Sequence, residues 1–180
     1  MRIEKLKTNY GLNVKFTHFP LHPETPPEGK PRAANPARDS RMKALMEQEG
    51  LPYKSERDMT YNSRLAQELA KWAESRGKGY EIHDPLFRAF FVAAKNIGDR
   101  KALADIAKQL GLPADEAIDA LVSRSFKQAV DDDWRRCAEL GVTAVPTFVI
   151  GPSTSLRAGR YALVGAQPYE ELEKLVAKAS

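Results

Sequence analysis

The chain has 180 residues, of which 42% are hydrophobic and 29% charged, and this composition predicts one soluble globular domain, or one domain carrying a large insertion. No window approaches the roughly 18 apolar residues of a membrane span. The N-terminal residues lack the apolar stretch of a secretory signal, so a cytoplasmic location is the default expectation. A single cysteine excludes an internal disulfide framework and a cysteine-rich zinc site.

The charges are nearly balanced, with 28 Lys and Arg against 24 Asp and Glu and a net charge of +4. Basic residues are spread through every segment and mixed with acidic ones, whereas a nucleic-acid-binding protein gathers them on one face among aromatic residues. We therefore expect neither a nucleic-acid partner nor a membrane partner.

The N-terminal part of the chain predicts a helix, a strand and a connector. Residues 2–10 carry apolar side chains at helical spacing and stop at Gly11. Residues 13–19 alternate apolar and polar side chains, which is typical of a strand. Six prolines make residues 20–36 an extended connector, which we interpret as an ordered crossing between elements.

The middle of the chain predicts a series of helices, bounded by capping residues and glycine stops. Asp84 followed by Pro85 matches an N-cap and first helical position, and Asp99 is a typical N-cap. Either Ser123 or Ser125 is expected to cap the last helix of the series. The expected helices cover approximately residues 38–49, 64–76, 85–94, 100–110, 114–121 and 126–140.

After Gly141 the pattern changes to strands. The apolar run 147–150 predicts a buried strand, and Pro146 must stand at its start because proline cannot donate to a ladder. Residues 160–164 are the expected partner strand, and Pro168 begins a last helix.

This order of elements predicts an α/β sheet layer interrupted by a helical insertion. Residues 1–36 and 141–180 are assigned to the sheet domain, and residues 37–140 to the inserted helical domain. The bond between Val145 and Pro146 could be cis or trans, since cis costs only about 0.5–1 kcal/mol before proline.

Most residues that could carry chemistry favour a structural interpretation. His18 and His22 do not share a helix face, and no metal site is expected. His83 is interpreted as a packed or surface imidazole. The run 131–133 is interpreted as a solvated helix face, because consecutive helical residues point about 100° apart. Cys137, near a helix C-terminus without a C-x-x-C partner, is interpreted as a small buried hydrophobic residue.

Several blocks along nearly the whole chain are similar to one known family. They are Phe19-Pro-Leu-His-Pro, Asn62-Ser63-Arg64-Leu65-Ala66, His83 with Leu86-Phe87 and Phe90-Phe91, Asn96-Ile97-Gly98-Asp99, Gly141-Val142, Val145-Pro146-Thr147-Phe148-Val149-Ile150 and Gly165-Ala166-Gln167-Pro168. In this order they resemble the FrnE-type branch of the DsbA family, which are thioredoxin-fold thiol–disulfide oxidoreductases. The resemblance implies a DsbA-like sheet with a helical insertion domain.

The resemblance also implies a site. Val145 and Pro146 would form the cis-proline loop, which in this family faces a C-x-x-C motif at a helix N-terminus, where the thiolate is stabilised. The residue before the proline offers its backbone to a bound peptide, as in strand addition. Ala144, Val145, Pro146 and Thr147 are therefore the expected binding residues for a protein or peptide thiol or disulfide substrate.

The sequence departs from the family pattern at its start. Residues 2–6 resemble the helix segment just downstream of the second cysteine, so the first strand and both redox cysteines are missing. Loss of that central strand should expose backbone donors and acceptors. A misplaced start or truncated gene, a homodimer that completes the sheet, and a redox-inactive binding module are the three explanations.

The leading hypothesis is a DsbA-like oxidoreductase domain that is redox-inactive as the chain stands, with no catalytic residue and no cofactor. One alternative is an enzyme similar to glutathione-dependent isomerases or kappa-class transferases, which would bind glutathione at Ala144 and Val145. The other is a non-catalytic peptide-binding module of thioredoxin-like fold.

Overall fold

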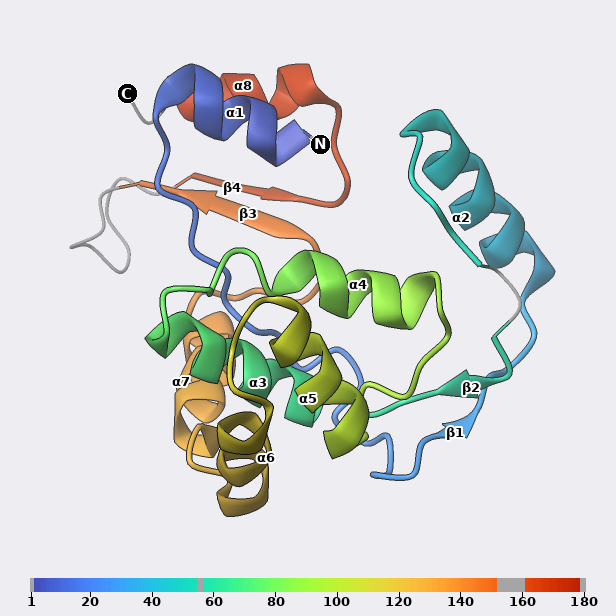
Figure 1. The fold of residues 1–180 in the computed structure, drawn as a ribbon. Coiled ribbons are helices and arrows are strands. Elements are labelled where there is room, and N and C mark those ends of the chain that lie inside the picture. Colours follow the sequence, from blue (N-terminus) through green and yellow to red (C-terminus); the bar gives the residue numbers. More distant parts are fainter. Residues whose placement is uncertain (1, 55–56, 152–160, 179–180) are drawn as a thin grey trace. The chain divides into compact units, whose positions relative to one another are not determined.

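The computed structural model describes residues 2–54, 57–151 and 161–178. Helices dominate the described chain, and its strands are two to four residues long (Figure 1). The elements are α1 (Arg2–Tyr10), β1 (Lys30–Pro31), α2 (Pro36–Gln48), β2 (Met59–Thr60), α3 (Arg64–Ser75), α4 (His83–Phe91), α5 (Arg100–Gln109), α6 (Ala114–Ser123), α7 (Lys127–Glu139), β3 (Thr147–Ile150), β4 (Tyr161–Val164) and α8 (Tyr169–Ala177). Over these described ranges, no helix has the length and apolar character needed to cross a membrane.

The chain forms two compact units. The terminal unit consists of Met1–Leu21 and Asp132–Ser180, and the helical unit consists of His22–Asp131. The connector expected at residues 20–36 contributes to the helical unit, because β1 pairs antiparallel with β2 and the Asn62 amide donates to the Thr25 carbonyl.

In the terminal unit, β3 and β4 form an antiparallel hairpin whose register pairs Thr147 with Val164. Figure 1 shows α1 and α8 side by side on one face of this hairpin. Their buried side chains pack against the inward residues of the strands. This cluster comprises Leu6, Leu172 and Val176, with Phe148, Ile150 and Leu163 packed against it.

The strand predicted at residues 13–19 is wrong. The segment keeps the expected alternation of burial, since Val14 and Phe16 are half-buried whereas Lys15 and Thr17 are exposed. Within the described residues, however, the only ladders are those of β1 with β2 and β3 with β4. Alternation sets which side chains face inward, but a strand also needs a neighbour for its backbone groups.

In the helical unit, α3 lies at the centre of the core and its Leu69 and Ala73 are fully buried. Side chains of α4, α5 and α6 complete the cluster. Its buried members are Ala66, Leu69, Ala70, Trp72, Ala73, Ile82, Leu86, Ala89, Ile97, Leu103, Ile106, Ala107, Ala117 and Leu121.

The capping residues give mixed results. Asp99 caps α5 as predicted, with its carboxylate accepting from the Ala102 N–H at 2.8 Å. Asp84 lies inside the first turn of α4 rather than at its N-cap. Neither Ser123 nor Ser125 caps α7, because both hydroxyls donate backward to carbonyls of α6. A serine side chain can donate to a preceding carbonyl as well as accept from a following N–H, so its presence alone does not mark a helix start.

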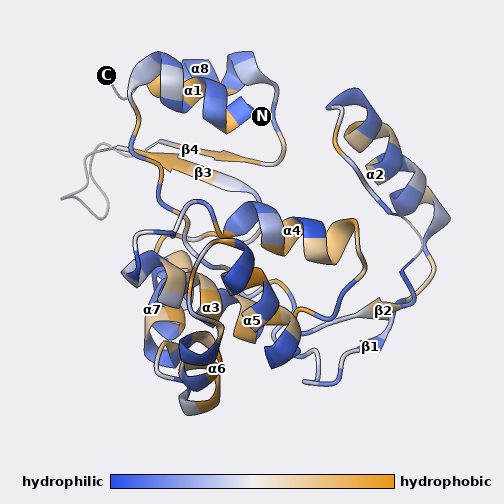
Figure 2. Cartoon of the chain, in the orientation of Figure 1, coloured by the Kyte–Doolittle hydropathy of each residue, from blue (hydrophilic) through white to orange (hydrophobic). Residues whose placement is uncertain are grey.

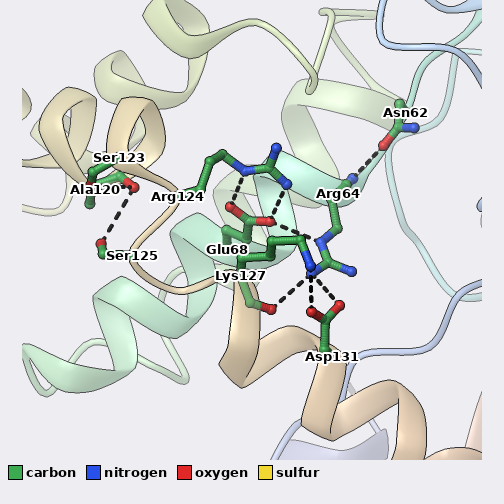
Figure 3. Close-up of polar contacts among 9 residues, drawn as sticks. All are labelled: Asn62, Arg64, Glu68, Ala120, Ser123, Arg124, Ser125, Lys127 and Asp131. Carbon is green, nitrogen blue, oxygen red and sulfur yellow. Dashed lines mark hydrogen bonds and ion pairs between the residues drawn. The ribbon is translucent and has the colours of Figure 1, made fainter.

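An ion network around the buried Glu68 joins α3 to the start of α7 (Figure 3). Arg124 binds both oxygens of Glu68, at 2.7 and 2.6 Å, and Arg64 binds the same carboxylate at 2.9 Å. Arg64 also reaches Asp131 at 2.6 Å, and Lys127 binds Asp131 at 2.7 Å. Burial acts to raise the pKa of Glu68, but the two guanidinium groups outweigh it and hold that pKa below its usual range. Glu68 is therefore a charged structural group whose lone pairs are engaged.

We predict that Glu68→Gln destabilises the protein by about 3 kcal/mol, because it leaves two guanidinium groups near a buried amide. This is the low end for breaking a buried pair, since Arg124 stays partly exposed. Urea unfolding monitored by circular dichroism measures the change. Glu116→Gln, which breaks an exposed pair with Arg76, is the control and should cost less than about 1 kcal/mol. Equal effects of the two variants would contradict the assignment.

His83 is a packed imidazole, 8% exposed, and burial lowers its pKa to about 4. The unfolded chain binds a proton at its ordinary pKa near 6.5, so only the unfolded state is protonated between these values. We predict that stability is fully present above pH 6.5 and falls by on the order of 3 kcal/mol toward pH 4. Unfolding of the wild type and His83→Gln across this range tests it. Parallel profiles for the two proteins would contradict it.

Candidate functional site

The candidate site is the loop 144–147, which leads into β3. The bond between Val145 and Pro146 is cis. The loop is closed on itself, because the Thr147 hydroxyl donates to the Ala144 carbonyl at 2.6 Å. Ala144 and Thr147 are half-buried, whereas Pro146 is exposed and Val145 is 45% exposed. Val145 and Pro146 are thus exposed between two half-buried residues that are joined by a hydrogen bond.

A second segment, the turn after β4, holds the other side of this loop. The Gly165 N–H donates to the Pro146 carbonyl at 2.8 Å, which extends the β3–β4 ladder by one bond. The Gln167 side chain closes the turn by donating to the Val164 carbonyl at 2.8 Å. The guanidinium of Arg2 in turn donates to the carbonyls of Ala166 and Gln167. The start of α1 therefore supports the segment against which the loop rests.

The backbone of Val145 is the feature of the loop that can act on another molecule. Within the described residues, neither its N–H nor its C=O makes a hydrogen bond. An exposed residue with both backbone groups available can pair with one residue of an added strand. The chemistry that this geometry supports is recognition of an extended backbone. The four expected binding residues thus lie together, and their role as a binding site stays a prediction.

Cys137 is not placed to act as a nucleophile. Its side chain is buried in α7, and its thiol donates to the His18 carbonyl at 3.5 Å. Burial raises the pKa of the Cys137 thiol, and the Asp133 carboxylate raises it further. The thiol is therefore protonated at neutral pH, whereas thiol–disulfide exchange requires the thiolate. Its interpretation as a buried hydrophobic residue agrees with this position.

The interpretation of residues 131–133 as a solvated face is wrong for two of the three. Asp133 is buried and accepts from the His18 N–H at 3.0 Å, and Asp131 belongs to the Glu68 network. Only Asp132 is exposed. The 100° step between helical residues, which separates the three carboxylates, also points them into three different surroundings.

Metal ligands do not gather anywhere in the part of the chain that the structure describes. That part contains no group of three or more His, Cys, Asp or Glu side chains able to hold an ion. The His22 imidazole lies 3.5 Å from the Glu24 carboxylate on the surface.

Sequence reasoning missed the supports of the loop. The contact of Arg2 with residues 166–167 joins opposite ends of the chain, and no local pattern signals it. The pair of Arg64 and Glu68 has the i, i+4 spacing of a helical ion pair, so the sequence pattern could have indicated this contact. The contact of Arg124 with Glu68 has no such local signal, because the tertiary fold brings the two residues together.

Comparison with a family and with a curated protein gives two matches. The family described as DSBA-like thioredoxin domain matches residues 1–177. The uncharacterized protein YwbO of Bacillus subtilis is 35% identical over 88 residues, which are 48% of this chain. That match spans 44% of YwbO, less than half of its length.

Two solved structures share the fold. One is described as a "putative protein disulfide isomerase" from Nitrosomonas europaea, with a TM-score of 0.74, 19% identity, and coverage of 98% of this chain and 86% of that one. The other is a probable DsbA oxidoreductase from Streptomyces coelicolor, with a TM-score of 0.67, 27% identity, and coverage of 79% and 59%. At 19% identity the first likeness concerns the fold alone.

Proposed function

Because the chain belongs to the DsbA-like thioredoxin domain family, we propose that residues 144–147 dock an extended peptide segment of a protein thiol or disulfide substrate. The observation that carries this proposal is Val145, a residue 45% exposed on an anchored loop, whose N–H and C=O make no hydrogen bond among the described residues. Pairing at Val145 would add a short strand of substrate beside the loop. Thr147 and Ala144 position the loop and do not need to contact the peptide.

The redox part of the proposal rests on the single cysteine. The printed sequence has no second cysteine with which Cys137 can form an intramolecular disulfide, and its thiol is buried and protonated. We therefore assign this polypeptide substrate docking without disulfide exchange of its own. This agrees with the leading hypothesis of a DsbA-like domain that is redox-inactive as it stands.

Three finer expectations remain proposals. The first is a sheet domain at residues 1–36 and 141–180 with an insertion at residues 37–140; the two compact units support it in outline, although residues 22–36 fall in the helical unit and residues 132–140 in the terminal unit. Membership of the FrnE-like branch and a cytoplasmic location stay predictions of the sequence.

We predict that Val145→Asp weakens peptide binding by about tenfold, because a charge would face the bound strand and the burial of one valine would be lost. Fluorescence anisotropy with a labelled, S-alkylated insulin B chain measures the affinity. Val122→Asp is the matched control, since Val122 is 61% exposed on α6, and it should bind like the wild type. Unchanged affinity in Val145→Asp would exclude the loop as the docking site.

We also predict no insulin reduction by this polypeptide beyond that of Cys137→Ser, because the protonated thiol cannot attack a disulfide. The turbidity of precipitating insulin chains reports the rate. Turnover clearly above the Cys137→Ser variant would overturn the redox assignment while leaving the docking proposal in place. Calorimetry with glutathione tests the alternative of a glutathione-dependent isomerase. Glutathione binding to the wild type that is lost in Val145→Asp would favour that alternative.

A further inference from the structure

The strand β3 has a ladder partner on one side only. Among the described residues, β3 and β4 form a two-stranded sheet, and neither strand takes part in another ladder. The edge of β3 that faces away from β4 therefore has no neighbouring strand within this part of the chain. An unpaired edge offers backbone donors and acceptors to an added strand.

The register of the hairpin shows which backbone groups lie along this free edge. In an antiparallel ladder, hydrogen-bonded pairs alternate with pairs whose N–H and C=O groups point away from the partner strand. The Gly165 N–H donates to the Pro146 carbonyl, so this pair is hydrogen-bonded, and Phe148 falls in the next such pair. Thr147 and Val149 lie in the intervening pairs. Their N–H and C=O groups thus point to the free edge of β3.

The free edge continues the candidate docking loop. Val145 precedes Thr147 by two residues, and among the described residues its N–H and C=O likewise make no hydrogen bond. Val145, Thr147 and Val149 are spaced by two residues each, and alternate residues of an extended chain repeat at the same interval, about 6.6–6.8 Å. One extended peptide can therefore pair with all three residues.

The side chains beside the free edge are mainly apolar. Phe148 and Ile150 pack in the cluster with α1 and α8, so Thr147 and Val149 lie on the opposite face of the hairpin. On that face Val149 is 40% exposed, and Val164, the ladder partner of Thr147, is 53% exposed. Figure 2 shows hydrophobic residues over most of both strands. Neighbouring side chains on one face of a sheet contact each other, so this face favours apolar residues in an added strand.

We infer that a peptide docked at Val145 continues along the free edge of β3 and pairs with the backbone of Thr147 and Val149. This inference rests on the proposed docking function and specifies its substrate class. The substrate is an unfolded segment of at least five residues that can form a strand and carries apolar side chains at alternate positions. Main-chain pairing provides the affinity, and the apolar face provides the side-chain preference.

The size of the free edge favours a peptide over a second copy of the chain. β3 has four residues, whereas a specific interface between folded proteins uses about 20–30 residues on each side. A peptide can bind through main-chain hydrogen bonds over a few residues. An extended peptide is therefore the occupant that fits this edge.

The variant Val149→Pro tests the pairing, because proline removes the N–H on the free edge and is tolerated in an edge strand. We expect about tenfold weaker binding of labelled, S-alkylated insulin B chain in fluorescence anisotropy, since one hydrogen bond to the peptide is lost. Val164→Pro is the matched control, because its N–H points away from β3, and its affinity should stay within about threefold of wild type.

The two docking variants separate this inference from the proposed function. Unchanged affinity in Val149→Pro, together with weakened binding in Val145→Asp, would overturn pairing along β3 and leave docking at Val145 in place. Unchanged affinity in both variants would overturn the inference and the proposed function together.

Exchange of amide protons with water, measured by NMR on the millisecond timescale, tests the same edge without a substitution. In the free chain, the Thr147 and Val149 amides should exchange directly with water, whereas the Phe148 amide is held in the ladder. With unlabelled S-alkylated insulin B chain at about ten times its dissociation constant, exchange at Thr147 and Val149 should slow by about tenfold. Unchanged rates at both amides would overturn the inference. Slowing without peptide that increases with protein concentration would also overturn it, because a second copy would then cover the edge.

Discussion

The hydrogen bond from the Gly165 N–H to the Pro146 carbonyl is the contact on which the candidate site depends. It continues the β3–β4 ladder past the last paired residues and ties the exposed loop to the turn after β4. Without it, the loop would be attached only through its own chain neighbours. With it, the backbone of Val145 is held in place at the end of the hairpin. Binding of a peptide strand would therefore cost little conformational entropy of the loop.

The hairpin itself depends on the helices that cover it. A two-stranded sheet is marginal alone, so the packing of Leu6, Leu172 and Val176 on its inner face stabilises it. Arg2 adds a polar link, since it belongs to α1 and binds the carbonyls of residues 166–167. The two ends of the chain thus support the same loop. The helical unit has its own hydrophobic core and its own charge network around Glu68.

Local chemistry predicted most helices and the β3–β4 hairpin, because caps, glycine stops and apolar periodicity act over a few residues. Asp99 and the glycine after α1 are examples. The strand expected at residues 13–19 failed because pairing depends on a neighbour that local pattern does not report. The four residues of the candidate loop were predicted from a family resemblance, and their role in binding stays a prediction. Asp133 and Arg124 were not predicted, because their partners lie far away in the sequence.

The most direct test of the docking role is a map of amide chemical shifts by NMR during titration with an unlabelled extended peptide. Strand addition at the loop predicts the largest shifts at the amides of Ala144, Val145 and Thr147, with smaller ones at Gly165 across the ladder. Shifts confined to the helical unit, or none at saturating peptide, would contradict the account.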